Sequence, residues 1–374
     1  GIKGFQPRAV TSETENLARM LTGIGEELRL RLAALGERRL QDLVGRTDLL
    51  TQVLHRDRLE VGALLLRPAI ACTDECLRPR IVRKPLNYLT KIISELVMER
   101  FARGRTEVHY ADDEVRSTDR AVGTYLAGAM VRQFEDGIYR RVLLDLESSV
   151  PGNGLCSFII PGFHAFVEGG SQDGAAKGCF GGRLAVLKGK NFFGRRVDGS
   201  TGKSFGYGAV GGLLMLQNMA DSRACIRLSG ADAVFGGRIT APLRDDKRNI
   251  ATRAHLKGFA FEYMTGGRVV VLGDPGPWIC AGMTGGVIYQ CLYPEFGFDQ
   301  EALTRRLARG AMVALSPLEE QGLADIKDLL PVYIRELEKS FQHQEAQAVS
   351  ELLAEAAHRF MVIVPSPQRT LPAE

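Results

Sequence analysis

The stretch from Val197 to Ser204 holds the residues of this chain that come nearest to a site for chemistry. Its sequence, Val-Asp-Gly-Ser-Thr-Gly-Lys-Ser, is close to a phosphate-binding loop, in which Lys203 would contact phosphate and Ser204 would bind Mg²⁺. Such a loop needs a glycine where Val197 stands, and a helix directly after it whose N-terminal amides bind phosphate. The glycine-rich residues from Phe205 to Gly212 predict a turn instead. We therefore expect a turn, and keep a nucleotide-binding enzyme that uses Lys203 and Ser204 as the alternative.

A dinucleotide-binding motif overlaps this stretch. Gly206, Gly208 and Gly211 match G-x-G-x-x-G, and Asp221 and Asp232 lie near the distance at which such folds place the acid that binds ribose. The motif requires a helix after its glycines, whereas the apolar run that follows here predicts a strand. We expect no NAD site, and interpret these glycines as part of a repeat.

A nucleophile motif and a cysteine pair also fall short of a site. Gly202, Ser204 and Gly206 match G-x-S-x-G, but that motif needs a strand–turn–helix setting. Cys72 and Cys76 could supply two metal ligands, whereas a closed zinc site takes four and no second pair lies nearby. We expect no catalytic, cofactor-binding or metal-binding residue on the chain, and leave open a redox role or a shared metal at the two cysteines.

The overall composition excludes several classes of protein. The chain has 374 residues, of which 45% are hydrophobic and 25% charged, and its net charge is only +4 with both signs interspersed. This indicates an ordinary globular surface and no nucleic-acid partner. No run approaches the roughly 20 apolar residues of a membrane helix, and no signal peptide is recognisable. With seven scattered cysteines, we expect a reducing, cytoplasmic setting.

Glycine divides the chain into three regions. Of its 42 glycines, 28 lie between Gly152 and Gly286, 11 lie in the first 150 residues and three lie after Gly286. We expect a helical linker region over residues 1–115, a β domain over 116–295 and a C-terminal helical segment over 296–374.

Helix signals support the first and last regions. Ser12 and Glu15 form a capping box before an apolar series spaced by three and four, and Gly36 is placed as the C-terminal cap. Pro85 is placed to begin a second helix, which should end near Gly104. Further helices are expected over residues 117–133, 329–341 and 346–360, and the apolar run of residues 360–364 predicts a short strand or an extended tail.

The middle region alternates short apolar runs with glycine-rich turns. The runs are too short for helices, and several are rich in β-branched residues, so they predict strands. They are Leu184–Leu187, Leu213–Leu216, Val269–Leu272 and Val287–Tyr289.

Paired glycines recur before these strands. Five Gly-Gly pairs recur at intervals of 30, 25, 30 and 19 residues, each before a predicted strand, and three of them carry a further glycine three residues earlier. Glycine permits positive φ and close backbone approach at a corner. One such unit cannot bury its own strand, but stacked units can, so we expect a β-helix of stacked turns. The repeat glycines are Gly178, Gly181, Gly182, Gly208, Gly211, Gly212, Gly236, Gly237, Gly266, Gly267, Gly282, Gly285 and Gly286.

Specific segments of the repeat resemble a known family. Glu262–Gly267, Val269–Gly273 and Ala281–Gly286 resemble the signature of the C-terminal domain of the glutamate synthase large subunit, which is named for its GXGXG repeat. Arg227–Ala231 resembles the family's Arg-Asn-Ser-Gly-Ala. The resemblance extends from about residue 10 to 366, through the start of that domain at Thr118–Gly123, the helical linker at Val44–Leu50 and the final segment at Phe360–Pro365.

Three segments depart from the family's pattern. Lys257–Phe261 replaces a Gly-Asp-His/Asn-Gly-Cys motif, Arg244–Arg248 forms an insertion-like basic loop, and Tyr289–Phe298 also diverges. These departures leave open a relative that uses the same scaffold for another substrate.

The resemblance implies a mainly β fold, a right-handed parallel β-helix with flanking helices and no catalytic residue of its own. In the family, this domain packs beside a flavin barrel that carries FMN and an iron–sulfur cluster, near a glutamine amidotransferase domain. The family's reaction transfers the glutamine amide nitrogen to 2-oxoglutarate. The implied role is a scaffold or docking domain for such partners, together with an electron-donor subunit. A scaffold in another assembly, such as a formyl-transfer complex, is the remaining alternative.

Overall fold

The computed structural model describes residues 10–66, 86–134, 140–247 and 249–366, with side chains from residue 14 onward. The chain divides into two compact units: one runs from Phe5 to Pro85, and the other comprises Leu86–Glu374 together with Gly1–Gly4. Cys72 and Cys76 lie outside the described residues, as does Pro85.

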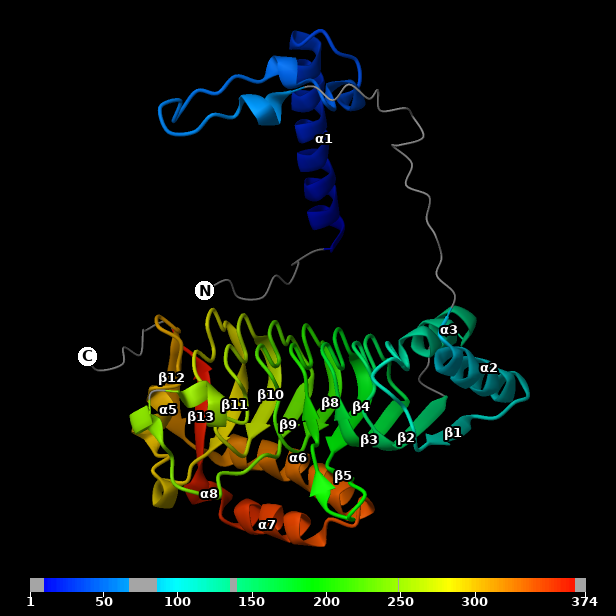
Figure 1. Cartoon of the computed structure of the whole chain (residues 1–374), viewed down its shortest axis with the longest axis vertical. Coiled ribbons are helices and arrows are strands. Elements are labelled where there is room, and N and C mark those ends of the chain that lie inside the picture. Colours follow the sequence, from blue (N-terminus) through cyan, green and yellow to red (C-terminus); the bar gives the residue numbers. More distant parts are fainter. Residues whose placement is uncertain (1–9, 67–85, 135–139, 248, 367–374) are drawn as a thin grey trace. The chain divides into compact units, whose positions relative to one another are not determined.

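Most strands of the larger unit follow one another directly, and its longer helices come before and after this series (Figure 1). Its strands are β1 (Glu107–Asp112), β2 (Arg141–Ser149), β3 (Phe163–Ser171), β4 (Phe180–Leu187), β5 (Gly189–Lys190), β6 (Arg196–Val197), β7 (Ser200–Thr201), β8 (Gly211–Leu216), β9 (Asp232–Phe235), β10 (Thr265–Val271), β11 (Gly285–Cys291), β12 (Val313–Pro317) and β13 (Phe360–Pro365). Its helices are α2 (Tyr88–Ala102), α3 (Thr124–Phe134), α4 (Ile250–Arg253), α5 (Gln300–Thr304), α6 (Glu320–Lys339), α7 (His343–Ala354) and α8 (Ala356–Arg359), with 3-10 turns η6 (Asp245–Lys247) and η7 (Pro294–Phe296).

One large, mostly parallel sheet dominates this unit. Its order is β1-β2-β3-β4-β8-β9-β10-β11-β13-β12, and β7 pairs with β3. All neighbours from β1 to β11 are parallel, whereas β13 is antiparallel to both β11 and β12. Figure 1 shows these strands side by side in nearly the order of the chain. Parallel strands need both faces covered, which explains their continuous apolar runs.

The predicted strands are confirmed. Leu184–Leu187 lies in β4, Leu213–Leu216 in β8 and Val287–Tyr289 in β11, while Val269–Leu272 fills β10 and continues one residue past its end. Their register aligns Leu184 with Leu214, and Leu214 with Ala233, so that apolar side chains stack strand upon strand. The last apolar run is a strand, β13, rather than a tail.

Helix α6 crosses the strands and forms ion pairs with several of them. Arg268 of β10 contacts Asp325 and Asp328, Arg183 of β4 contacts Glu336, and Lys339 contacts Asp145 of β2. A helix rises 1.5 Å per residue and strands lie about 4.8 Å apart, so about three helix residues span each strand. The contacts of Asp328 and Glu336, eight residues apart, cover the three strand steps from β10 to β4 at about this ratio. Figure 1 shows α6 running along the sheet.

The smaller unit has little that holds it together. It contains α1 (Val10–Ala34) and the 3-10 turns η1 (Leu40–Leu43), η2 (Thr47–Leu49) and η3 (Gly62–Leu65). None of the side chains from residue 14 to 66 is buried. The apolar series predicted to face a core is therefore exposed, with Leu17, Met20, Leu21 and Ile24 at 49–57% exposure.

Several local predictions need correction. Helix α1 begins at Val10, so Ser12 is not its N-terminal cap. The second helix begins at Tyr88 because the Asn87 side chain accepts a hydrogen bond from the Thr90 amide. The described residues form a mixed α/β structure with a large, mostly parallel sheet and eight α-helices, and strands β1 and β12 fall in stretches expected to be helical.

We predicted that the pair Gly236–Gly237 precedes a strand. In the structure it follows one, β9. A Cβ on Gly236 would lie 2.0 Å from the Tyr333 hydroxyl of α6. Glycine at position 236 therefore lets α6 pack closely against the end of β9. The residues in register with the other pairs are Gly230 and Ala231, since Leu213 pairs with Asp232.

Candidate docking surface

A regular turn precedes each of the five strands β4, β8, β9, β10 and β11, and a sixth precedes β3. In each turn, three alternate residues adopt left-handed backbone conformation, with φ between 51° and 80°. The first positions are Gly154, Gly174, Ser204, Arg223, Phe259 and Trp278; the second are Cys156, Ala176, Gly206, Cys225, Phe261 and Cys280; the third are Phe158, Gly178, Gly208, Arg227, Tyr263 and Gly282.

Backbone hydrogen bonds explain why non-glycine residues accept this conformation. The amide of Arg223 donates to the next turn at Gly258, the amide of Cys225 donates back to Phe205, and the amide of Arg227 donates forward to Glu262. Alternating handedness thus directs successive amides to opposite neighbours. A left-handed residue costs about 1–2 kcal/mol, which hydrogen bonds made along the whole stack can offset.

The second position of each turn faces the interior. Cys225, Phe261 and Cys280 are fully buried there, and Phe261 lies edge-on to Phe235 with ring centroids 6.0 Å apart. Burial raises the pKa of the Cys225 thiol to about 12, so the thiol stays protonated at neutral pH. The residues at the second position therefore form part of the packed core, and the Cys225 thiol there is not a thiolate.

Aromatic and aliphatic side chains at the first and third positions, and at the residue two places after the third, lie outside. Six of them form what we call the outer ridge. They are 40–58% exposed, although side chains of this kind are usually buried. The members are Phe158, Phe180, Val210, Phe259, Tyr263 and Trp278.

Glycines in the next turn make room for two ridge aromatics. A Cβ on Gly178 would lie 2.5 Å from the Phe158 ring, and one on Gly282 would lie 2.6 Å from the Tyr263 ring. Phe259 and Trp278 stack with centroids 4.9 Å apart. Four of the six ridge side chains thus pack against a neighbouring turn.

Cations flank the ridge. The Arg227 guanidinium lies 5.7 Å from the centre of the Tyr263 ring, and the Lys177 ammonium lies 5.4 Å from that of Tyr207. Among the described residues, Lys177, Arg223 and Arg227 have no carboxylate within salt-bridge distance. Aromatic and arginine side chains are enriched at protein interfaces, so this surface has the chemistry of one.

The predicted nucleotide motifs form part of the same stack. The amide of Lys203 donates to Asp173, Ser204 takes the first left-handed position, and strand β8 begins at Gly211. No helix follows the lysine or the glycines, so the structure lacks the amide cradle of a phosphate-binding loop and the helix of a dinucleotide fold. Within the described ranges, no group of three potential metal ligands gathers, and no helix is long and apolar enough to cross a membrane.

Sequence reasoning found only part of this surface. It identified Gly178, Gly208 and Gly282 through their spacing, and missed Arg227 and Tyr263, which occupy the same position. The recurring spacing of seven residues from the first left-handed position to the Gly-Gly pair could have found them.

Stacked parallel turns with alternating left-handed residues define the class of fold, and sequence comparison identifies the family. The chain belongs to the GXGXG motif family, whose sequence profile matches residues 90–242 and 245–366. It is 25% identical over 366 residues to the glutamate synthase [NADPH] large chain of Bacillus subtilis, covering 94% of this chain and 22% of that protein. It is 28% identical over 383 residues to ferredoxin-dependent glutamate synthase 2 of Arabidopsis thaliana, covering 97% and 22%.

These relatives are much longer than this chain. A third, the ferredoxin-dependent glutamate synthase of Spinacia oleracea, is 29% identical over 308 residues, which cover 76% of this chain and 17% of that protein. The chain thus spans about a fifth of the length of the curated relatives it matches. It is a glutamate-synthase-like domain.

Proposed function

We propose that this chain is a non-catalytic scaffold that docks a catalytic domain or subunit of a glutamate-synthase-like oxidoreductase. The observation that carries the proposal is the outer ridge. Six large apolar side chains stand exposed along successive turns, and the stacked backbone fixes their positions. A surface ordered in advance loses little conformational entropy when it binds, which favours docking.

The proposed shape is a right-handed parallel β-helix. Two observations support it: one strand per turn pairs in parallel with the next, and a second ladder links Thr201, Ala220 and Leu256 on another side of the stack. Parallel connections within a sheet are right-handed in nearly all proteins. The repeat glycines would serve the corners of this coil, and the three regions over residues 1–115, 116–295 and 296–374 remain its proposed division.

The proposed partner is a flavin barrel with FMN and an iron–sulfur cluster, and this chain would hold neither cofactor. A glutamine amidotransferase and an electron donor would complete the assembly. The relatives' names support the redox setting, since one is described as NADPH-linked and others as ferredoxin-dependent. The flanking cations Lys177, Arg223 and Arg227 favour a partner surface that offers carboxylates and apolar groups.

Helix α1 offers a second docking element. Leu17, Ile24 and Leu28 recur along it at spacings of seven and four, and each is 44–54% exposed. An amphipathic helix stabilises itself mainly by burying its apolar face. We propose that a partner domain covers this face in the assembled enzyme.

Purification of the native complex tests the proposal. The ridge variant Tyr263→Ser/Trp278→Ser should bind the flavin/iron–sulfur partner at least about tenfold more weakly than the unaltered chain. The matched control is Phe192→Ser/Phe193→Ser, since these two phenylalanines are 97% and 81% exposed but lie outside the ridge. Flavin and iron should remain with the partner when the complex is separated.

Two results would overturn the proposal. One is stoichiometric FMN on the isolated chain, and the other is unchanged affinity in the ridge variant. A partner without flavin, such as a formyl-transfer enzyme, would replace the oxidoreductase assignment with the alternative assembly.

A further inference from the structure

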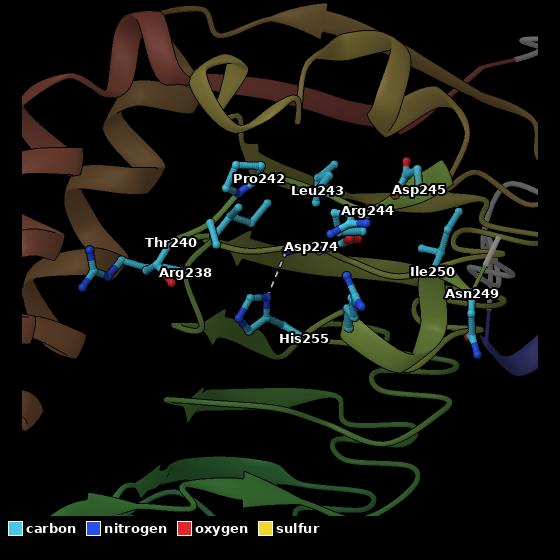
Figure 2. A pocket seen from close by; sticks show the side chains of 13 residues that line it. Arg238, Thr240, Pro242, Leu243, Arg244, Asp245, Asn249, Ile250, His255 and Asp274 are labelled. Atoms are coloured by element: carbon cyan, nitrogen blue, oxygen red, sulfur yellow. Dashed lines mark hydrogen bonds between the residues drawn. The ribbon is translucent and has the colours of Figure 1, made fainter. Parts of the chain in front are cut away.

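A pocket of about 310 Å³ lies away from the outer ridge, between the loop that follows β9 and the turn that follows β10. Figure 2 shows the His255 ring joined to Asp274 by a hydrogen bond, with the labelled loop residues arranged around them. Its lining includes Arg253, His255, Asp245 and Asp274, with Ile239 and Leu243 on the apolar side. The match to the family profile is interrupted at residues 243–244, within this wall.

Buried ion pairs connect the loop that lines the pocket to the rest of the larger unit. Arg306, which is completely buried, donates to both carboxylate oxygens of Asp274 at 3.0 and 2.8 Å and to both of Asp245 at 2.6 and 2.9 Å. Asp245 belongs to the loop and Asp274 to the turn after β10. The pocket is therefore held open by a buried ion cluster and is formed before any ligand arrives.

His255 contributes a hydrogen-bond donor. Its Nδ1 accepts the Asp274 amide at 3.2 Å, so the neutral ring carries its proton on Nε2. That nitrogen has no protein partner within the described residues. Gly237 and Gly273 make room for the ring, because a Cβ on either would lie 2.3 or 2.5 Å from it. The imidazole is thus fixed in the pocket wall with one donor unused.

Positive charge outweighs negative charge at this wall. The lining carries three arginines, and its two carboxylates both bind Arg306. Arg238 pairs with Glu345, and Arg244 lies 3.5 Å from Asp246. The exposed Arg253 has no carboxylate within salt-bridge distance among the described residues. Arg253 and His255 both line the pocket, and a guanidinium and an N–H donor without protein partners are suited to an oxyanion.

The remaining lining adds an apolar side. Ile239, Leu243 and Ile250 stand with Pro242 beside the charged groups. A pocket with an apolar lining and a few convergent polar groups is the usual form of a small-molecule site.

We propose that this pocket binds a small organic oxyanion, a carboxylate or a phosphate ester. Arg253 and the Nε2–H of His255 contact the oxyanion, and the isoleucines and Leu243 contact the organic part. The site is independent of the proposed docking function, because the ridge and the pocket share no residue.

Calorimetric titration of the purified full chain tests the site with two probes, inorganic phosphate and succinate. We expect one of them to bind with one-to-one stoichiometry, and the one that binds distinguishes a phosphate from a carboxylate ligand. Arg253→Ala should weaken binding at least tenfold. Lys247→Ala is the matched control, because Lys247 is an exposed cation of the same loop that does not line the pocket, and its affinity should stay within twofold.

A second readout reports on the imidazole. In nitrogen NMR, the Nε2 resonance of His255 should move on saturation with the binding probe and should not move in Arg253→Ala at the same concentration. Three results would overturn the proposal: no binding of either probe at millimolar concentration, equal losses in Arg253→Ala and Lys247→Ala, or an unmoved Nε2 resonance at saturation.

Discussion

Arg306 lies completely buried between Asp245 and Asp274 and donates to all four of their carboxylate oxygens. Asp274 lies in the turn that follows β10, while Asp245 belongs to the loop that departs from the family pattern. The Phe298 ring centre lies 5.3 Å from the guanidinium. One buried cation thus joins the repeat to its inserted loop.

Removing this cation should destabilise the protein strongly. Arg306→Met leaves the Asp245 and Asp274 carboxylates without their partner, and breaking a buried pair in this way costs about 3–5 kcal/mol. The free energy of urea unfolding of the larger unit measures the loss. Arg305→Met is the control, because Arg305 is 44% exposed and should cost no more than about 1 kcal/mol. Equal losses in the two variants would contradict the role of Arg306.

Glycine substitution should separate crowding from backbone strain. A Cβ on Gly267 would lie 2.2 Å from the Ala231 carbonyl oxygen, and its φ is +95°. Gly208 has a similar sign of φ, at +63°, but nothing lies within 4 Å of the added atom. Gly208→Ala should cost about 1–2 kcal/mol from strain alone, and Gly267→Ala should cost clearly more. Thermal unfolding ranks them, and the reverse order would refute close stacking as the reason for the glycine pairs.

The pH dependence of stability should show the buried imidazole of His255. Burial lowers its pKa from 6.5 to about 4, so the unfolded chain binds a proton there before the folded chain does. The stabilisation is complete above pH 6.5 and falls as pH decreases toward 4, by at most about 1.4 kcal/mol per pH unit. The unfolding free energies of the unaltered chain and of His255→Gln should therefore converge across this window. A constant difference would show that His255 titrates normally.

Helix α1 should exchange its amide hydrogens quickly while it lacks a partner. No side chain described from residue 14 to 66 is buried, so helix propensity and i,i+4 pairs such as Glu27–Arg31 are its main support. Hydrogen exchange followed by mass spectrometry should show weak protection over residues 14–34 and strong protection in β8. Strong protection of α1 in the isolated chain would argue against a role in docking.

The strands could be predicted from the sequence because their signal is local. Leu213–Leu216 and Val287–Tyr289 are short apolar runs that directly follow glycine pairs, and they are too short to form helices. The seven-residue spacing within each turn was harder to see, because Arg223, Phe259 and Trp278 adopt a conformation that glycine usually takes. Hydrogen bonds to neighbouring turns stabilise the left-handed backbone conformation of these residues. Such contacts join distant parts of the chain and cannot be predicted from the local sequence.

The misplacement of Gly236 has the same origin. Its neighbour is Tyr333, almost a hundred residues later in the chain, and only the path of α6 brings them together. The ridge and the pocket were also beyond sequence reasoning. The ridge residues line up, and His255 meets Asp274, only because turns distant in the sequence stack on one another.

Trp278 offers the most direct test of the docking account, because it is the only tryptophan in the chain and lies half-exposed in the outer ridge. Fluorotryptophan incorporated into this chain alone gives a single fluorine NMR resonance, which can be followed while the unlabelled flavin/iron–sulfur partner is added. The account predicts that the resonance shifts on complex formation and loses its sensitivity to solvent exchange into heavy water. A complex that forms with the resonance unmoved and still solvent-sensitive would contradict it.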